Sequence, residues 1–205
     1  MYTKLLIIPC SQSKKGGNSA IAARSIDEFI SPESSELLRS ARRSAFQRSQ
    51  TRLDMDSDAI PALFRYSGNM WSVEGFREAI QGALSDGLHV LVESGGYGLI
   101  RVEEGIHEYE ASINRTAPIW RHVFPLVLTD YISRNGINSI FVAGSGQYLQ
   151  ILRKKNWWGG RECRWFVARM SGDGNRYRVV PRAIGCAVRD LILSRFSTAS
   201  SWLTN

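Results

Sequence analysis

Three stretches of the chain are apolar at every position, and each ends abruptly in polar residues. They cover residues 5–8, 90–92 and 140–143. An apolar run without alternation is typical of a strand whose sheet is covered by helices on both faces. Residues 73–84 have the apolar spacing of an amphipathic helix and separate the first two runs, which gives a strand, a crossover and a parallel strand. The pattern therefore predicts an α/β fold with a mainly parallel central sheet.

The rest of the pattern predicts more helices and one hairpin. A Ser-Pro-Glu start followed by a thin apolar stripe predicts a helix over residues 31–53. Alternating residues in two neighbouring stretches predict a hairpin that extends the sheet. Helices are expected over residues 119–133, 147–154 and 183–196, and the hairpin over residues 164–170 and 177–181. A chain of 205 residues is long enough for one core, so we expect a single domain over residues 1–205.

Composition narrows the choice of partner and compartment. Lys and Arg number 26 against 19 Asp and Glu, a formal net charge of +7, which favours a polyanionic partner such as DNA. Three cysteines without Cys-x-x-Cys spacing predict neither a disulfide framework nor a zinc site. No apolar stretch approaches the length of a membrane span, and no signal-peptide pattern is present. We therefore expect a cytoplasmic protein that does not enter a membrane.

Polar side chains follow all three apolar runs. Because parallel strands end at one edge of their sheet, these segments should meet in one crevice. In the alternative, each segment is only a tight turn between a strand and a helix. The helix expected from Gln147 would also direct free N–H groups at an anion. The candidate binding residues are Cys10, Ser11, Ser13, Lys14, Ser94, Tyr97, Tyr109, Gly144, Ser145, Gln147 and Tyr148.

The same crevice offers acids but no recognisable cofactor motif. The chain has no Walker loop, no dinucleotide fingerprint and no histidines at metal-ligand spacing, so neither a cofactor nor a metal is expected. The segment 143–147 approaches a Gly-x-Ser-x-Gly elbow, but its second glycine comes one residue early. The remaining hydroxyls, aromatic rings and carboxylates suit hydrolysis of an N-glycosidic bond, whose transition state resembles an oxocarbenium ion. Glu93 is our first choice for the catalytic acid and Glu110 the second.

Two basic segments are candidates for contact with DNA. The helix predicted over residues 31–53 carries several arginines with few acids between them, which favours contact with phosphates over a merely solvated surface. Residues 153–165 interleave cations with tryptophans, a combination suited to base stacking and to phosphate contact. Packing of the tryptophans on the edge of the sheet is an equal alternative. The candidates are Arg39, Arg42, Arg43, Lys154, Lys155, Trp157, Trp158 and Arg161.

Three short motifs resemble a known group of proteins. Pro-Cys-Ser-x-Ser-Lys at residues 9–14, Glu-Ser-x-x-Tyr-Gly-Leu at 93–99 and Ile-x-x-Tyr-Glu at 106–110 resemble proteins related to the YaaA peroxide-stress protein and the Pro-Cys domain of archaeosine synthase. The resemblance covers roughly residues 4–150. It implies a fold like that of uracil-DNA glycosylase, a three-layer α/β/α sandwich around a short parallel sheet with its site at the carboxyl ends of the strands. Uracil-DNA glycosylases carry a water-activating aspartate after the first strand and a His-Pro-Ser motif in the second half, and both are missing here.

These observations lead to one main hypothesis and two alternatives. The main hypothesis is a DNA glycosylase that removes a modified or bulky base, similar to the phage-defence enzymes that remove glucosylated hydroxymethylcytosine from viral DNA. A flipped nucleotide would be stacked by Tyr97 or Tyr148 while the basic segments hold the duplex. One alternative is a non-catalytic, YaaA-like DNA-binding protein. The other is an enzyme acting on a 7-deazaguanine base or a free nucleoside, for which Cys10 and Lys14 would be the reactive groups.

Overall fold

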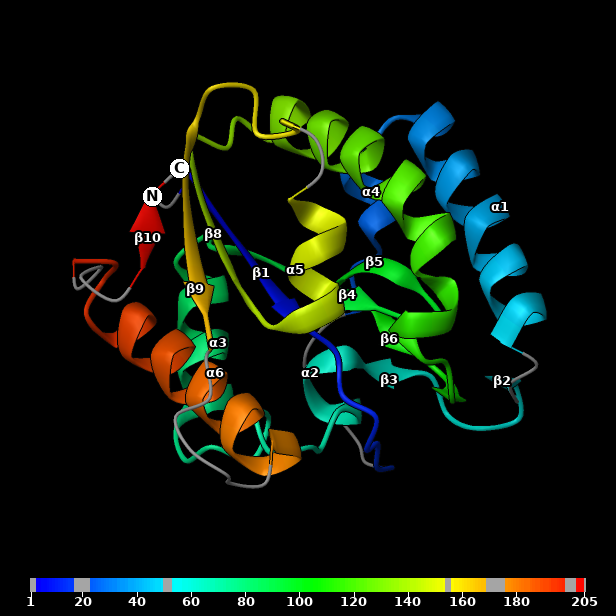
Figure 1. The fold of residues 1–205 in the computed structure, drawn as a ribbon, viewed down its shortest axis with the longest axis horizontal. Helices are drawn as coiled ribbons and strands as arrows, with labels where there is room; N and C mark the ends of the chain where they lie inside the picture. The colour runs from blue at the N-terminus through cyan, green and yellow to red at the C-terminus, as the bar shows by residue number, and fades with distance from the viewer. Residues whose placement is uncertain are drawn as a thin grey trace.

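Four parallel strands lie side by side in the middle of a six-stranded sheet (Figure 1). The computed structural model describes residues 3–16, 23–49, 53–153, 156–168, 176–197 and 202–204. The strand order within them is β10-β9-β8-β1-β4-β5. The parallel strands are β1 (Lys4–Pro9), β4 (His89–Ser94), β8 (Ser139–Gly144) and β9 (Glu162–Val167), and the antiparallel edges are β5 (Gly98–Arg101) and β10 (Leu203–Thr204).

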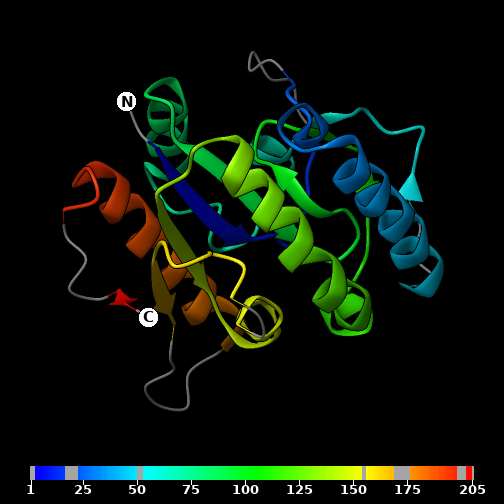
Figure 2. The ribbon, with the colours of Figure 1, turned by 90° about the horizontal axis from the view of Figure 1, so that it is seen from above.

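Helices cover both faces of this sheet (Figures 1 and 2). One face packs against η1 (Ile26–Phe29), α1 (Pro32–Ser49), α4 (Ile113–Arg134) and α5 (Gly146–Leu152). The other packs against α2 (Ala62–Arg65), α3 (Phe76–Ser85) and α6 (Arg176–Leu193). Two short antiparallel pairs join β2 (Leu53–Asp54) to β7 (Glu108–Tyr109) and β3 (Ile60–Pro61) to β6 (Gly105–Ile106). In the described part of the chain, no helix is both long and apolar enough to cross a membrane.

The strand β1 shows why the first apolar run does not alternate. Leu5 and Ile7 point into the core beneath α1, α4 and α5, whereas Leu6 and Ile8 point into the core on the opposite face. Successive side chains of a strand lie on opposite faces, so both sets must be apolar when both faces are covered. All four side chains are at most 1% exposed. The prediction of a largely parallel α/β fold is confirmed.

Two of the predicted helices are present with different bounds. Ser31 precedes α1, and its hydroxyl accepts a hydrogen bond from the N–H of Ser34 at 3.2 Å, as expected of a helix cap. The helix ends at Ser49, before the predicted end at residue 53, and Leu53 and Asp54 form β2. The helix expected from residue 119 instead begins at Ile113, with Pro118 and Pro125 inside it. The predicted start at residue 119 was therefore too late.

The predicted hairpin over residues 164–170 and 177–181 was wrong. Residues 177–181 belong to α6, and β9 pairs in parallel with β8 instead of with a following strand. The physical reason is the spacing of the apolar residues that follow, because Val180, Ile184 and Val188 recur every four positions and face the same core. The short alternation before Val180 is also compatible with the first turn of this helix. The tip of the expected hairpin lies outside the described residues.

A buried polar network lies at the start of β4, at the edge of the sheet opposite to the carboxyl ends. Arg101 donates to the hydroxyl oxygen of Tyr131 at 2.6 Å and pairs with Glu103. Since a guanidinium can only donate, the hydroxyl proton of Tyr131 is directed to Nδ1 of His89, 2.8 Å away. Burial, together with the charges of Arg101 and Arg24, lowers the pKa of His89 to about 4. His89 is therefore a neutral acceptor in the folded protein.

Folding stability should consequently fall as the pH is lowered from 6.5 towards about 4. In this window the unfolded chain takes up a proton at His89 and the folded protein does not, which favours unfolding. His89→Asn keeps an acceptor but cannot be protonated. Between pH values of about 7.5 and 5, we expect the wild type to lose roughly 1 kcal/mol more unfolding free energy than this variant in urea titrations, allowing for partial solvent screening. Equal losses would show that His89 is not the group responsible.

Candidate functional site

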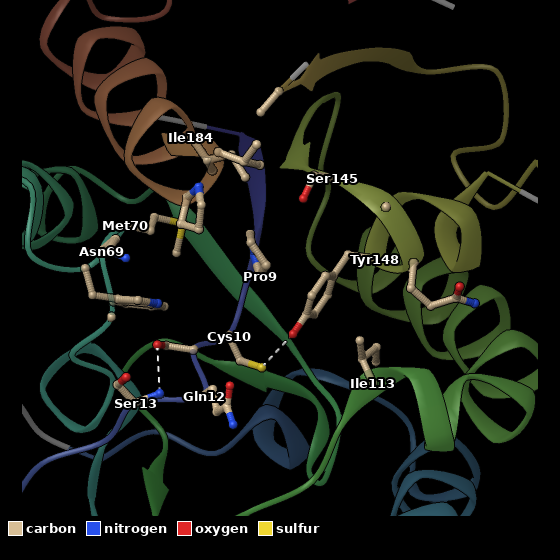
Figure 3. Close-up of a pocket in the computed structure, with 18 of the residues that line it drawn as sticks. Pro9, Cys10, Gln12, Ser13, Asn69, Met70, Ile113, Ser145, Tyr148 and Ile184 are labelled. Atoms are coloured by element: carbon tan, nitrogen blue, oxygen red, sulfur yellow. Dashed lines mark hydrogen bonds between the residues drawn. The ribbon is translucent and has the colours of Figure 1, made fainter. Parts of the chain in front are cut away.

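The order of the parallel strands places a ligand site between β1 and β8. Across the sheet the parallel strands lie in the order β4, β1, β8, β9. From β1 the chain first adds β4 on one side and then adds β8 and β9 on the other, so the direction of winding reverses between β1 and β8. Open α/β sheets bind ligands beyond the carboxyl ends of the strands at this reversal. A cavity of about 910 Å³ lies there, with Pro9 and Cys10 from the end of β1 and Ser145 from the end of β8 in its lining (Figure 3). Two of the three polar segments that the sequence predicted to meet thus lie at one cavity.

Four further segments complete the cavity wall. Among the candidate residues, Cys10, Ser11, Ser13, Ser145, Gln147 and Tyr148 line it. The start of α4 contributes Ile113 and Asn114, and α6 contributes Arg178, Val180, Pro181 and Ile184. The segment before α3 adds residues 68–71, and Gln12, Gly146 and Ala168 complete the lining. The walls thus come from both helical layers, with the end of β1 between them (Figure 3).

Cys10 and Tyr148 join the two strand ends across the switch point. The N–H of Cys10 donates to the carbonyl oxygen of Glu93 at 3.0 Å, which continues the pairing of β1 with β4. The Cys10 Sγ lies 3.2 Å from the hydroxyl of Tyr148 (Figure 3). Burial raises the pKa of Tyr148 well above its usual value, and the nearby Cys10 raises it further. Tyr148 therefore keeps its proton and can act as a hydrogen-bond donor.

The polar segment that follows β4 does not reach the cavity, because β4 turns back at once into the antiparallel strand β5. Ser94 pairs with Gly98 in this hairpin, and its hydroxyl lies 2.6 Å from that of Tyr109. The Tyr109 hydroxyl in turn lies 2.7 Å from that of Tyr66, and the N–H of Tyr97 donates to Ser94 at 3.1 Å. Ser94, Tyr66 and Tyr109 are each at most 2% exposed. They form an interior network beneath the site.

Lys14 fixes the shape of the loop that follows β1. Its ammonium group donates to the carbonyl oxygens of Ser11 at 3.3 Å and Gln12 at 3.1 Å, so it bridges its own loop. The same group lies 4.1 Å from the ring centroid of Tyr109, within the range of a cation–π interaction. Burial lowers the pKa of Lys14. In this structure Lys14 positions the loop and is not part of the cavity lining.

Neither candidate acid lines the cavity. Glu110 is exposed, beyond β7. Glu93 is 2% exposed, and its Oε1 atom has no hydrogen-bond partner among the described residues. Burial raises the pKa of Glu93 well above its usual value, which favours the uncharged form of the carboxyl group. Gly144, at the end of β8, is also buried and outside the lining.

The cavity is suited to an anion. Within the described part of the chain, no Asp or Glu lines it, and Arg178 is its one Lys or Arg side chain. The first turns of α4 and α6 also face it through Ile113, Asn114 and Arg178. Helix amino ends carry unpaired N–H groups and a partial positive charge, and the side chain of Ser112 does not cap α4. The electrostatic environment therefore favours negative charge on a ligand.

Sequence reasoning missed the wall formed by residues 68–71. Gly68 approaches the loop after β1 closely, because an added Cβ would lie 2.1 Å from the Ser11 Oγ and would require this hydroxyl to turn away. Trp71 also belongs to the lining, and its indole N–H has no partner among the described residues. The sequence indicated only a turn here. Nothing in the local pattern showed that this turn lies against Ser11.

The arginines expected to contact DNA from α1 are mostly engaged in ion pairs. Arg39 pairs with Asp27 at 2.9 Å, and Arg43 pairs with Glu36 at 3.1 Å. Both remain exposed, so contact with phosphates would compete with these carboxylates. The carboxylate that pairs with Arg39 thus comes from η1 and not from α1 itself. The phosphate-contact hypothesis for these two residues remains a prediction.

Arg42 has a structural task. Its guanidinium donates to the carbonyl oxygens of Tyr97 at 2.8 Å and Leu99 at 2.9 Å, and it pairs with Glu104 at 3.0 Å. These carbonyls belong to the hairpin turn and to the edge strand β5. An unpaired edge strand is a site for unwanted strand pairing, and Arg42 covers part of this edge. Its side chain is only 16% exposed.

The tryptophan-rich segment packs largely inward. Trp157 is 2% exposed, and its indole N–H donates to the carbonyl oxygen of Leu152 at 2.7 Å. Trp158 is partly buried, with its ring centroid 5.5 Å from that of Trp157. Arg161 donates to the carbonyl oxygen of Ile137 at 2.8 Å. Trp157 therefore packs in the interior, in line with the alternative in which the tryptophans pack against the sheet. Lys154 and Lys155 lie outside the described residues.

Comparisons with protein-family models, curated proteins and solved structures found no match to this chain. Among the residues that the structure describes, no group of three or more His, Cys, Asp and Glu side chains could hold a metal ion. The chemistry of the site must therefore be argued from its own geometry.

The uncharged state of Glu93 can be measured through stability. Above its usual pKa of 4.5, the unfolded chain releases a proton at Glu93 and the folded protein retains it, so stability should decline as the pH rises. The slope is at most about 1.4 kcal/mol per pH unit. Glu93→Gln should remove this decline and unfold at a higher temperature near pH 8, with little difference near pH 4. The exposed Glu110→Gln is the control, and an equal effect of both variants would contradict the assignment.

Proposed function

We propose that this protein binds a nucleotide of DNA in the cavity beyond β1 and β8 and hydrolyses the bond between its base and its sugar. The observation that carries this proposal is the composition of the cavity wall. Carboxylates are missing from the described lining, Arg178 and the amino ends of α4 and α6 face it, and amide and hydroxyl side chains complete it. This wall suits a phosphate-bearing ligand with a polar ring.

The binding step requires a nucleotide that has left the base stack. The amide side chains of Gln12, Asn69, Asn114 and Gln147 offer donors and acceptors for the edge of a base, and Met70, Trp71 and Ile184 offer apolar contact. The volume of about 910 Å³ is near the upper end of the usual range of about 300 to 1,000 Å³ for ligand pockets. It favours a nucleotide whose base carries a bulky modification.

The hydrolytic step uses the buried acid beside the cavity. Water attacks the anomeric carbon, the bond to the base breaks, and the departing base takes up a proton. Burial favours the protonated form of Glu93, so its carboxyl group is the proton donor to the departing base. The attacking water then returns a proton to the Glu93 carboxylate. A buried, unpaired acid beside a ligand cavity is destabilising, which is typical of a residue kept for function.

The spatial arrangement also supports the family resemblance. The three motifs that carry it lie in contact, because Cys10 hydrogen-bonds to Glu93 and Ser94 hydrogen-bonds to Tyr109. Helices cover both faces of the parallel sheet, as in the three-layer uracil-DNA-glycosylase-like fold that we propose for this chain. The proposed substrate, a modified base in phage DNA, follows from this resemblance together with the size of the cavity.

A second candidate function is DNA binding without hydrolysis. It is favoured by one specific observation, since neither Glu93 nor Glu110 belongs to the cavity lining. In that case Glu93 would be an interior group without a role in turnover. The two candidates predict the same DNA affinity for the wild type and differ in what happens to the bound nucleotide.

Base release from modified phage DNA tests the proposal. Abasic sites are measured by alkaline cleavage of end-labelled strands, and affinity by fluorescence anisotropy. Glu93→Gln should lower base release by about 100-fold or more, the contribution typical of a general acid, while affinity stays within about twofold. Asn114→Trp places an indole in the cavity and should abolish base release. His122→Trp is its matched control, because His122 is exposed on the same helix and does not line the cavity.

The outcomes separate the candidates. Base release that depends on Glu93 and on an open cavity supports the glycosylase. DNA binding that Asn114→Trp weakens, with no abasic sites on any modified DNA, supports the second candidate. If the wild type neither releases bases nor binds DNA, both are rejected.

A further inference from the structure

The first half of α6 carries cations that are free to contact a partner. Arg178 and Arg182 are exposed, and neither makes an ion pair among the described residues. They are four positions apart in one helix, so their side chains lie on the same side of it. Val179 between them is 53% exposed. On α1, by contrast, Arg39, Arg42 and Arg43 are held by carboxylates, and of its arginines only Arg48 makes no ion pair among the described residues.

The same part of α6 forms one wall of the cavity. Val180, Pro181 and Ile184 line it together with Arg178, so the cationic side of the helix adjoins the cavity. Gly185 lets α6 approach the segment before α3 closely, because an added Cβ would lie 2.6 Å from the carbonyl oxygen of Met70. The helix and this segment therefore form one continuous rim.

Independent evidence for a ligand at this rim comes from an unsatisfied donor. Trp71 is fully buried in the cavity wall, and its indole N–H has no partner among the described residues. A buried donor without a partner is unfavourable by about 1 to 3 kcal/mol, so a ligand acceptor at this position would be stabilising. This donor favours a ligand that offers hydrogen-bond acceptors, and the lack of Asp and Glu in the described lining allows that ligand to be an anion.

We propose that the amino-terminal half of α6 is the surface that holds the DNA backbone, with Arg178 and Arg182 contacting the phosphates that flank the nucleotide in the cavity. This inference rests on the proposed function, because it assumes that the ligand in the cavity belongs to a DNA chain. The spacing of the two arginines, about one helical turn or 5 to 6 Å, is close to that of successive phosphates.

The dependence of DNA affinity on salt tests this assignment. Each phosphate contact contributes about 0.9 to the slope of log affinity against log salt concentration for a duplex. The double variant Arg178→Gln with Arg182→Gln should therefore lower the slope by about 1.8 and weaken binding on the order of tenfold. Arg178→Lys with Arg182→Lys keeps both charges and should keep the slope. The probe is a short duplex carrying the modified base, measured by anisotropy between about 50 and 200 mM salt.

The matched control removes the same charge away from the cavity. Arg24→Gln with Arg134→Gln changes two exposed arginines that do not line the cavity and should leave the slope within about 0.3 of the wild-type value. Arg43→Gln with Arg48→Gln tests α1 as the competing surface. If that variant lowers the slope and the α6 variant does not, α1 holds the backbone and the inference is overturned. If the wild type binds the duplex but neither the α6 variant nor the α1 variant changes the slope, the inference fails while the proposed function stands. If the wild type binds no DNA, both fail.

Discussion

The burial of β1 on both faces is the constraint on which the rest of the structure depends. Its side chains fill two separate cores, and its backbone is paired with β4 on one side and β8 on the other. A strand held in this way has no room for polar side chains along its length. Polar groups can emerge only where the strand ends, and Pro9 ends it. The loop of Cys10 and Ser11 therefore lies at the point where the winding of the sheet reverses, and the cavity forms there.

The neighbouring strand β4 ends at the same edge of the sheet, but its polar residues stay buried. β4 ends in Glu93 and Ser94, but a tight antiparallel hairpin follows, so these polar groups remain inside the protein. The hydroxyl of Ser94 is satisfied by Tyr109, whereas the Oε1 of Glu93 has no partner among the described residues. Satisfied buried groups stabilise a fold, and unsatisfied ones destabilise it. This contrast between adjacent residues is the strongest structural reason to assign Glu93 a function and Ser94 a supporting role.

The sequence predicted the sheet well because its signal is local. The apolar runs of β1, β4 and β8 could be recognised without knowing their neighbours, and each is a parallel strand of the sheet. The site was predictable only in part, because its remaining walls are long-range. Gly68 meets Ser11 across more than fifty residues, and the start of α6 meets both strand ends only in the folded chain. The sequence predicts a ligand loop at Gly95-Gly96, but this turn is the tip of the hairpin between β4 and β5.

Charge was the least predictable feature, because ion pairing depends on tertiary contacts. The net charge of +7 is the same whichever arginines are paired. The local sequence of its helix shows no partner for Arg42, yet Arg42 pairs with Glu104 and donates to two carbonyl oxygens of the β5 hairpin. Arg178 has no such partner among the described residues, and it stands beside a wall free of carboxylates. A polyanion gains most where no carboxylate must first be displaced, so the rim formed by α6 is the more favourable place for it.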